Sequence, residues 1–305
     1  MTKSHAIEVK KLFKVYKGNI IAINNIDLNI PHGSIFGLLG PNGAGKSSFI
    51  NILAGLVSKS SGSVKICDVD IDSNPKTARG AIGVVPQEVN IDPYFTQIEI
   101  LDNQAGYYGI SSKDIQNKTI LRELNLSSKT NAYSRSLSGG MKRRLMIAKA
   151  IVHRPPVLVL DEPTAGVDVE LRQKLWTYIK RLNKSGTTII LTTHYLKEAE
   201  KLCDQIAIIN KGKIIVSKTK DELLKMIGTK EIHIQLKQPI NKVPHNLFPY
   251  LFKHNKDLLI LRYKKNMTST GKIIKLIMKN KLDILELTTK ETDLEEIFLK
   301  LLKSK

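Results

Sequence analysis

The sequence predicts an α/β fold whose parallel sheet is covered by helices on both faces, followed by a small α+β appendage. Apolar runs of strand length, at residues 34–40, 157–163 and 187–194, alternate with helical patterns. Continuous apolar strands of this kind are typical of sheets that are buried on both faces. This pattern ends after about residue 227, where a smaller set of strands and helices begins.

The composition is that of a soluble globular protein. The 305 residues suffice for one large or two modest domains, with 42% hydrophobic and 25% charged residues. Residues 1–16 lack the apolar core of a secretory signal, and no apolar run approaches the roughly 18 residues that span a bilayer. Cys67 and Cys203 match no metal or redox spacing and favour a reduced, cytoplasmic setting. Any work at a membrane therefore requires a second chain that spans it.

The net charge of +20 invites two interpretations. It could mark a nucleic-acid or membrane-surface partner, or it could belong to a solvated, lysine-rich surface. Only nine of the 48 basic residues are arginine, and the lysines are scattered rather than gathered in one block. We favour the solvated surface and expect no nucleic-acid partner.

The chain begins with strands and then enters the main sheet. Residues 6–16 and 21–30 alternate apolar and polar side chains at period two, which predicts an N-terminal antiparallel β subdomain. A buried strand follows at 34–40, and a glycine-rich loop then leads into a helix that stops at Gly55. Two further strands are predicted at residues 61–66 and 81–87.

Helical spacing dominates the next part of the chain and predicts a helical insertion at about residues 90–150. The main sheet then resumes, and the whole of residues 1–227 is predicted as one domain. Its remaining elements are a strand at 157–163, a helix at 169–186, a strand at 187–194, a helix at 195–203 and a hairpin at 205–216. Residues 228–305 form the predicted accessory domain, with strands at 231–236, 257–263 and 283–288 and helices at 271–280 and 293–302.

A phosphate-binding loop is predicted at residues 40–47, because GPNGAGKS fits G-x-x-x-x-G-K-[ST] between a predicted strand and a predicted helix. Glycines let backbone N–H groups converge on phosphate oxygens, and the helix start adds the positive end of its dipole. Lys46 would reach the β- and γ-phosphates, and Ser47 would ligate Mg²⁺. The predicted nucleotide-binding residues here are Gly40, Asn42, Gly43, Ala44, Gly45, Lys46, Ser47 and Ser48.

Polar side chains follow three of the predicted strands. Asp161 and Glu162 emerge after an apolar strand, where Asp161 would hold Mg²⁺ through Ser47 or water and Glu162 would polarise an attacking water. Alone, such a pair could equally cap a helix or bind solvent. Gln87 and His194 also follow strands; each is more often structural, although His194 could hydrogen-bond the γ-phosphate or the water.

A second anion-binding turn is predicted at Ser138, Gly139 and Gly140, at the start of a helix in the insertion. The insertion would place this turn too far from the phosphate-binding loop for both to hold one nucleotide within one chain. Two-fold dimerisation resolves this, because each loop can then face the partner's Ser-Gly-Gly turn. The basic run 142–144 would either lie near the triphosphate or pack the helical insertion.

Together these motifs resemble the ATP-binding subunit of ABC transporters over about residues 5–225. The stretches GPNGAGKSS, VVPQ, LSGGM, VLVLDEP, AGVD and TTH match the Walker A motif, Q-loop, signature, Walker B motif, D-loop and switch, in that order. The resemblance implies a P-loop NTPase core with an N-terminal antiparallel β subdomain, a helical insertion and an α+β appendage. It also implies ATP hydrolysis with Mg²⁺.

The resemblance further implies roles for single residues. Tyr16 would stack on adenine, Gln87 would link Mg²⁺ to a transmembrane partner, Asp168 would contact the partner subunit and His194 would sense the γ-phosphate. Two copies, or one copy and a related ATPase, would close on two ATP molecules. They would act on the inner face of the cell membrane with a separately encoded permease.

The signature favours one branch of the family. Met141 stands where the commonest signature has Gln, and LSGGMKRRL together with the C-terminal LTTKETDLEEIFLKLL resembles ABC-2-type and drug-resistance exporters. Export of a drug, lipid or polysaccharide class of substrate is therefore expected. The alternatives are an importer ATPase, and a soluble ABC ATPase acting on ribosomes or DNA, which the single cassette disfavours. Intact Glu162 and His194 argue against a regulator without turnover.

Overall fold

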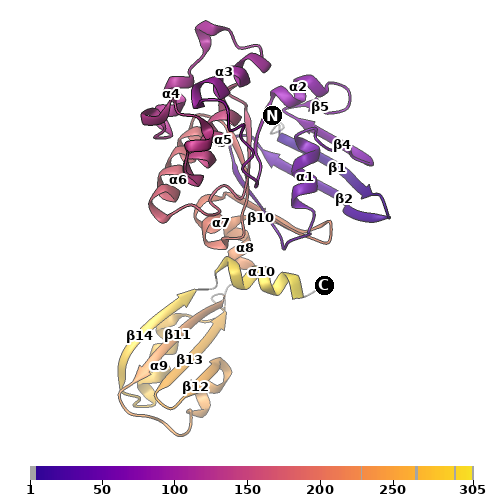
Figure 1. Cartoon of the computed structure of the whole chain (residues 1–305). Helices are drawn as coiled ribbons and strands as arrows, with labels where there is room; N and C mark the ends of the chain where they lie inside the picture. The colour runs from indigo at the N-terminus through magenta and orange to yellow at the C-terminus, as the bar shows by residue number, and fades with distance from the viewer. Residues whose placement is uncertain (1–4, 228, 265–266, 292, 304–305) are drawn as a thin grey trace. The chain divides into compact units, whose positions relative to one another are not determined.

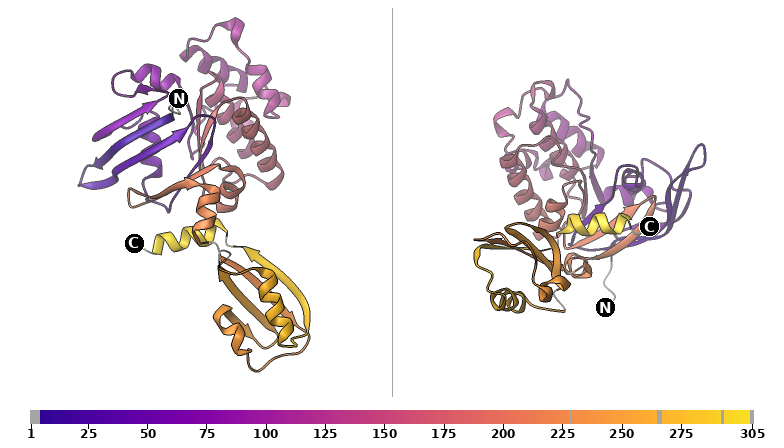
Figure 2. Two further views of the ribbon diagram at one scale, coloured as in Figure 1. Left: turned by 180° about the vertical axis from the view of Figure 1, so that it is seen from behind. Right: turned by 90° about the horizontal axis from the view of Figure 1, so that it is seen from below.

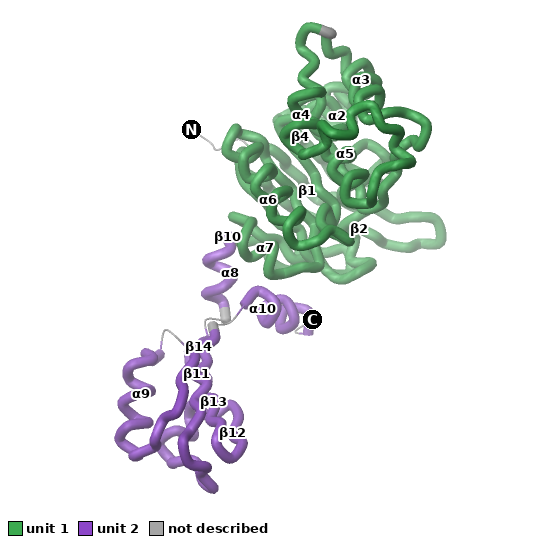
Figure 3. Tube along the Cα trace, turned by 60° about the vertical axis from the view of Figure 1, so that its left-hand side comes forward, with its two compact units in different colours: residues 1–218 green, residues 219–305 purple. Residues whose placement is uncertain are grey.

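The computed structural model describes residues 5–227, 229–264, 267–291 and 293–303. It divides into two compact units, unit 1 up to Lys218 and unit 2 from Thr219 (Figure 3). Unit 2 begins one helix before the predicted boundary after residue 227, because α8 (Lys220–Ile227) falls in unit 2. There α8 contacts α10 (Leu294–Lys303). The extent of the ATPase domain, residues 1–227, stays a prediction.

The N-terminal strands of unit 1 form an antiparallel sheet with the order β2-β1-β4-β5. The period-two pattern of the first 30 residues explains it, because β1 and β2 bury alternate side chains such as Val9 and Leu28. Gly18 turns the chain between them at a φ of +80°. The strands are β1 (His5–Tyr16), β2 (Ile20–Pro31), β4 (Ser61–Ile66) and β5 (Val69–Asp70).

The second sheet of unit 1 has the order β10-β9-β3-β8-β7-β6. Every residue of β3, β7 and β8 is buried, as the continuous apolar runs predict for strands covered on both faces. Strands β9, β3, β8, β7 and β6 run parallel to one another. Their bounds are β3 (Ile35–Leu39), β6 (Ile82–Val85), β7 (Val157–Asp161), β8 (Thr188–Thr192), β9 (Gln205–Asn210) and β10 (Lys213–Thr219).

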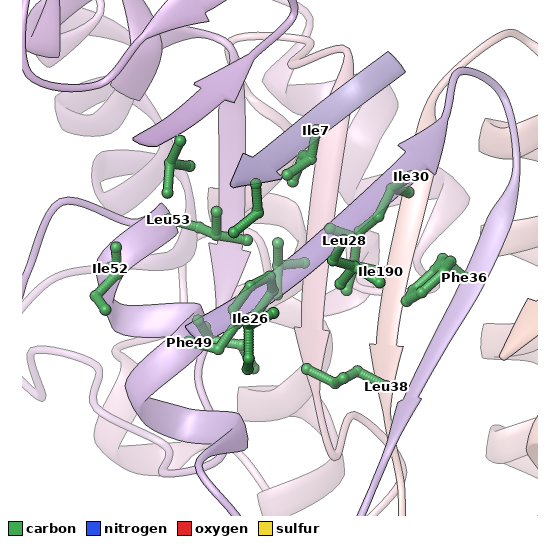
Figure 4. Close-up of a cluster of buried hydrophobic side chains, with 14 of the residues drawn as sticks. Ile7, Ile26, Leu28, Ile30, Phe36, Leu38, Phe49, Ile52, Leu53 and Ile190 are labelled. Atoms are coloured by element: carbon green, nitrogen blue, oxygen red, sulfur yellow. The ribbon is translucent and has the colours of Figure 1, made fainter. Parts of the chain in front are cut away.

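Helix α1 (Lys46–Leu53) joins the two sheets of unit 1 into one core. Its buried Phe49 and Ile52 lie in the same cluster as Ile26 of β2 and Ile190 of β8 (Figure 4). Burial of side chains of this size stabilises a fold by about 1.5–3 kcal/mol each. The phosphate-binding loop that precedes α1 is therefore anchored on both sides.

The predicted helical insertion forms a lobe on the side of unit 1 away from the antiparallel sheet (Figures 1 and 2). Its last helix, α5, contacts β6 as well as α3 and α4, so the lobe is fixed to the edge of the parallel sheet. Helix α3 begins with a capping box between Thr96 and Glu99. The helices between β5 and β9 are α2 (Pro75–Gly80), α3 (Gln97–Tyr107), α4 (Asn117–Glu123), α5 (Gly139–Ile151), α6 (Val169–Lys184) and α7 (Leu196–Leu202).

Unit 2 contains an antiparallel sheet with the order β12-β13-β11-β14. Helix α9 covers one of its faces (Figure 1), where Ile273 and Ile277 pack with Ile232 and Leu261. The predicted strands and both predicted helices of the appendage are present, and β12 is an additional strand. The elements are β11 (Thr229–Leu236), β12 (Leu251–Asn255), β13 (Leu258–Lys264), α9 (Thr270–Lys279), β14 (Ile284–Glu291) and α10.

Candidate functional site

Four neighbouring strands of the parallel sheet deliver the predicted site residues to one edge. The loop 40–45 follows β3, Gln87 follows β6, Asp161 ends β7 with Glu162 directly after it, and His194 follows β8. Because β3, β8, β7 and β6 are adjacent and parallel, their carboxyl ends meet at the same edge. In open α/β sheets this edge is where ligands bind.

The glycines of the loop are required by this chain's own backbone. Gly43 has a φ of +76° and Gly45 a φ of +109°, in the left-handed region that favours glycine. A Cβ on Gly45 would clash with the carbonyl oxygen of Ala22, and a Cβ on Gly40 with that of Ile209. Glycine is therefore required at these loop positions, and α1 starts directly behind the loop at Lys46.

Lys46 lies between the loop and the carboxylates of β7. Its Nζ donates to the carbonyl oxygens of Gly40, at 2.7 Å, and Pro41, at 3.1 Å. Burial lowers the pKa of Lys46, and the charges of Glu162 and Asp161 offset part of that effect. The ammonium is thus within electrostatic reach of both acids.

The predicted adenine contact lies beside the start of α1. Tyr16 Oη donates to Ser48 Oγ at 3.3 Å, and Lys14 Nζ lies 4.7 Å from the centroid of the Tyr16 ring. Tyr16 is 38% exposed. Asn42, Gly43 and Ser47 are exposed at the same loop, and Ala44 is buried.

The side chain of Glu162, directly after β7, contacts side chains that follow two other strands, β6 and β8. Gln87 Nε2 donates to Glu162 Oε2 at 3.2 Å, and His194 Nδ1 lies 3.2 Å from the same oxygen. The φ of Glu162 is +48°, and its backbone N–H donates to both the carbonyl and the hydroxyl oxygen of Thr192. A side chain other than glycine in this region costs energy and is typical of functional sites.

Asp161 carries a buried carboxylate that its own surroundings only partly satisfy. The Thr192 hydroxyl donates to Oδ1. Burial raises the pKa of Asp161, and the hydrogen bond from Thr192 offsets part of that increase. The chemistry fits Mg²⁺, which prefers oxygen ligands and is commonly held by one or two carboxylates plus substrate phosphates. Across the described residues no group of three or more His, Cys, Asp or Glu could hold a metal ion. Ser47 and Gln87 stay the predicted further ligands.

The Ser-Gly-Gly turn lies at the start of α5, as the sequence predicts. Ser138 caps the helix by accepting a hydrogen bond from the Met141 N–H at 3.3 Å, and Ser138 and Gly139 are exposed. A Cβ on Gly139 would meet no atom of the described residues within 4 Å. Within residues 5–227, no hydrogen bond or ion pair joins this turn to the loop 40–48. The structure of one chain therefore leaves the two glycine-rich turns unconnected.

The predicted D-loop residue also begins a helix. Asp168 caps α6 by accepting the Leu171 N–H at 2.9 Å, and the rest of its side chain is exposed. Its contact with a partner subunit stays a prediction.

Arg143 and Thr192 are site residues that the sequence analysis did not single out. Arg143 appeared only in the basic run 142–144, and the structure resolves that run in favour of packing, because Arg143 is 3% exposed and bonded to backbone carbonyls. Thr192 contacts both Asp161 and Glu162. The sequence could have indicated Thr192 as a site residue, because it lies at a strand end two residues before His194.

Comparison with known proteins agrees with this arrangement. Residues 23–165 match the protein family described as ABC transporter. The Nod factor export ATP-binding protein I of Cupriavidus pinatubonensis is 41% identical over 231 residues, which cover 75% of this chain and 71% of that protein. The protein of the same name from Rhizobium etli is 38% identical over 232 residues, covering 75% and 73%.

Solved structures show the same fold. An ATP-binding subunit of an ABC transporter superposes with a TM-score of 0.68 at 28% identity, covering 73% of this chain and 93% of that one. An ATP-binding cassette solved as a dimer in a post-hydrolysis state with ADP and Pi gives 0.63 at 27% identity, covering 70% and 98%. The chain therefore belongs to the ABC transporter family, as an ATPase subunit.

Proposed function

We propose that this chain powers an exporter, with Glu162 as the group that polarises the attacking water. The single observation that carries the hydrolytic role is the meeting of Gln87 and His194 at one oxygen of Glu162, beside the buried Asp161. An ATPase of this type works by positioning and charge stabilisation around the γ-phosphate, with little covalent chemistry from the protein.

The residues of the strand edge divide this work. The amides of the loop 40–45 and Lys46 bind the triphosphate, and Tyr16 stacks on the adenine. Mg²⁺, when bound, neutralises the charge that develops on the phosphate oxygens, and Ser47, Asp161 and Gln87 would hold it. His194 would hydrogen-bond the γ-phosphate, because its side chain is exposed and lies against Glu162.

The second half of each ATP site comes from a partner subunit in this proposal. ABC ATPase subunits dimerise and work with transmembrane components. Ser138 and Gly139 are exposed and Gly140 is partly buried, and the three would face the triphosphate on the partner's loop, with Asp168 at the same interface. The support is that, among the described residues, no hydrogen bond or ion pair joins the Ser-Gly-Gly turn to the loop 40–48. The partner is a second copy or a related ATPase.

The direction and place of transport rest on the relatives. Two of them are named for Nod factor export, and the LSGGMKRRL signature resembles the exporter branch. Across the described residues, no helix has the length and hydrophobicity needed to cross a bilayer. We therefore propose a peripheral position on the inner membrane face, bound to a separate permease.

The test is Glu162→Gln. This change keeps the size of the side chain and its hydrogen bonds but removes the charged base. Steady-state ATPase should fall by at least about 100-fold, while ATP affinity is retained and a nucleotide-bound dimer accumulates. Substantial residual turnover would refute the role of Glu162, and purification with ribosomes or DNA in place of a membrane protein would refute the transport role.

A further inference from the structure

The buried guanidinium of Arg143 joins α5, the helix that the Ser-Gly-Gly turn begins, to the edge of the parallel sheet that carries Glu162. Arg143 lies on α5, five residues after Ser138, and is 3% exposed. All five of its N–H groups donate to backbone carbonyl oxygens, which leaves none unsatisfied. Nε donates to Pro163 at 3.1 Å, Nη1 to Pro86 at 2.7 Å and Gln87 at 2.9 Å, and Nη2 to Asp161 at 2.7 Å and Glu162 at 2.6 Å.

The five acceptors belong to two short segments, 86–87 directly after β6 and 161–163 at the end of β7. These segments carry the side chains of Gln87 and Glu162, which bond to each other. A guanidinium is planar and presents its donors in a fixed fork, so it holds both backbones at set positions relative to α5. Buried carbonyls need partners, and Arg143 provides one to each of the five.

We propose that Arg143 is a positioning residue that makes the signature turn, Gln87 and Glu162 move as one rigid unit. The inference rests on the proposed function, in which Ser138 faces the ATP held by the partner while Glu162 acts on the ATP of its own loop. Engagement of the signature with one nucleotide then sets the position of Glu162 at the other. Arg143 thus couples the two ATP sites of the dimer through a single side chain.

Arg144 provides a matched control on the same helix. It is partly buried, and its side chain also donates only to carbonyls, those of Gly140, Leu124 and Asn125. None of these follows a strand of the parallel sheet. Arg144 therefore stabilises the helical insertion without reaching Gln87 or Glu162.

The kinetic test compares R143Q, R143K and R144Q in the full-length protein. R143Q should lower kcat by about 10- to 100-fold, because misplacement of a catalytic group by about 1 Å has effects of this size. The KM for ATP should change by less than about threefold, since the loop is untouched. The Hill coefficient for ATP should fall from above one to one. R143K has three N–H donors and should recover part of kcat, and R144Q should keep the wild-type Hill coefficient.

Hydrogen exchange gives a readout that needs no turnover. In the nucleotide-free protein, R143Q should speed exchange in peptides that cover residues 84–90 and 160–168, and R144Q only in those that cover 120–127. Equal changes in both variants, or a wild-type kcat and Hill coefficient in R143Q, would overturn the proposal. So would a Hill coefficient of one in the wild type. If R143Q does not fold, the same kinetic and hydrogen-exchange measurements on R143K test the proposal.

The outcomes separate this inference from the proposed function. A wild-type protein without ATPase activity would refute the function, while hydrogen exchange would still test the connection through Arg143. An active wild type with unchanged exchange in R143Q would refute the connection alone.

Discussion

The two glycine-rich turns of unit 1 use glycine for different reasons. In the loop before α1, Gly45 has a φ of +109° and no room for a Cβ beside the carbonyl of Ala22. At the start of α5, Gly139 has ordinary helical geometry and open space where a Cβ would point. The first glycine is required by the fold. For the second, the described residues give no steric reason for glycine.

Two buried acids, Glu231 and Asp161, also differ in how far their own chain supplies their hydrogen-bond partners. Glu231 of unit 2 is satisfied within its own chain: Arg262 Nε donates to it at 2.8 Å, and His233 Nε2 lies 2.8 Å away on the other oxygen. Asp161 of unit 1 has one hydrogen-bond donor in Thr192 and a raised pKa. Glu231 is thus ion-paired within its own unit, whereas the carboxylate of Asp161, at the strand edge, stays costly to ionise.

Gly45→Ala should have the largest effect. The new Cβ meets both an unfavourable φ, which costs about 1–2 kcal/mol, and a backbone clash, which costs about 1–3 kcal/mol. We expect a loss of about 2–5 kcal/mol in unfolding free energy, together with loss of ATP binding. Thermal melting and nucleotide titration measure both. Gly18→Ala is the control, because it has positive φ but open space and should lose only the strain.

Glu231→Gln should weaken unit 2 by about 1–3 kcal/mol, because a buried charge network loses one partner. Burial raises the pKa of Glu231, but the bonds from His233 and Arg262 outweigh it and lower the pKa below the usual 4.5. Its contribution to stability is therefore complete above pH 4.5 and is lost as pH falls through the lowered pKa. Denaturant titrations of both proteins at several pH values test this. A stability difference that grows in acid would contradict it.

Asp161→Asn should increase stability and remove function. Burial raises the pKa of Asp161, so the folded chain holds the ionised form at a cost that disappears as pH falls through that raised pKa. Asparagine still accepts the Thr192 hydroxyl bond without the charge. Without nucleotide or Mg²⁺ at neutral pH we expect Tm to rise by a few degrees, with Mg²⁺-dependent ATPase lost. A lower Tm would show that the carboxylate is stabilised within the chain.

Gly139→Ala should change stability least. Alanine is a better helix former than glycine, and the Cβ meets open space, so unfolding free energy should stay within about 0.5 kcal/mol or rise. ATPase should nevertheless fall by at least about tenfold, because the Cβ would lie where the partner's phosphate approaches. Gly271→Ala, at the start of α9 with equally open space, should change neither quantity. Normal activity in Gly139→Ala would place the signature away from phosphate.

The sequence predicts the site well because parallel strands align their carboxyl ends. Gln87, Glu162 and His194 could be assigned to strand ends from apolar runs alone, and their meeting follows from the topology. Arg143 could not be found in this way. Its acceptors lie 18–57 residues away and are backbone atoms, so they leave no sequence pattern.

The fold shows the same limit at its short elements. Strand β5 has two residues and α2 has six, too few for a hydrophobic period to be recognised. Helix α8 directly follows β10, and no helix was predicted there from the sequence. Such elements depend on tertiary contacts rather than on their own propensities.

The central claim is that one ATP site is shared between two chains, and the mass of the nucleotide-bound protein tests it most directly. Light scattering should show E162Q at the mass of one chain without nucleotide and of two chains with ATP. The double variant S138R/E162Q should bind ATP with similar affinity but stay at the mass of one chain. An ATP-dependent dimer of the double variant, or ATP hydrolysis by a strictly monomeric wild type, would contradict the account.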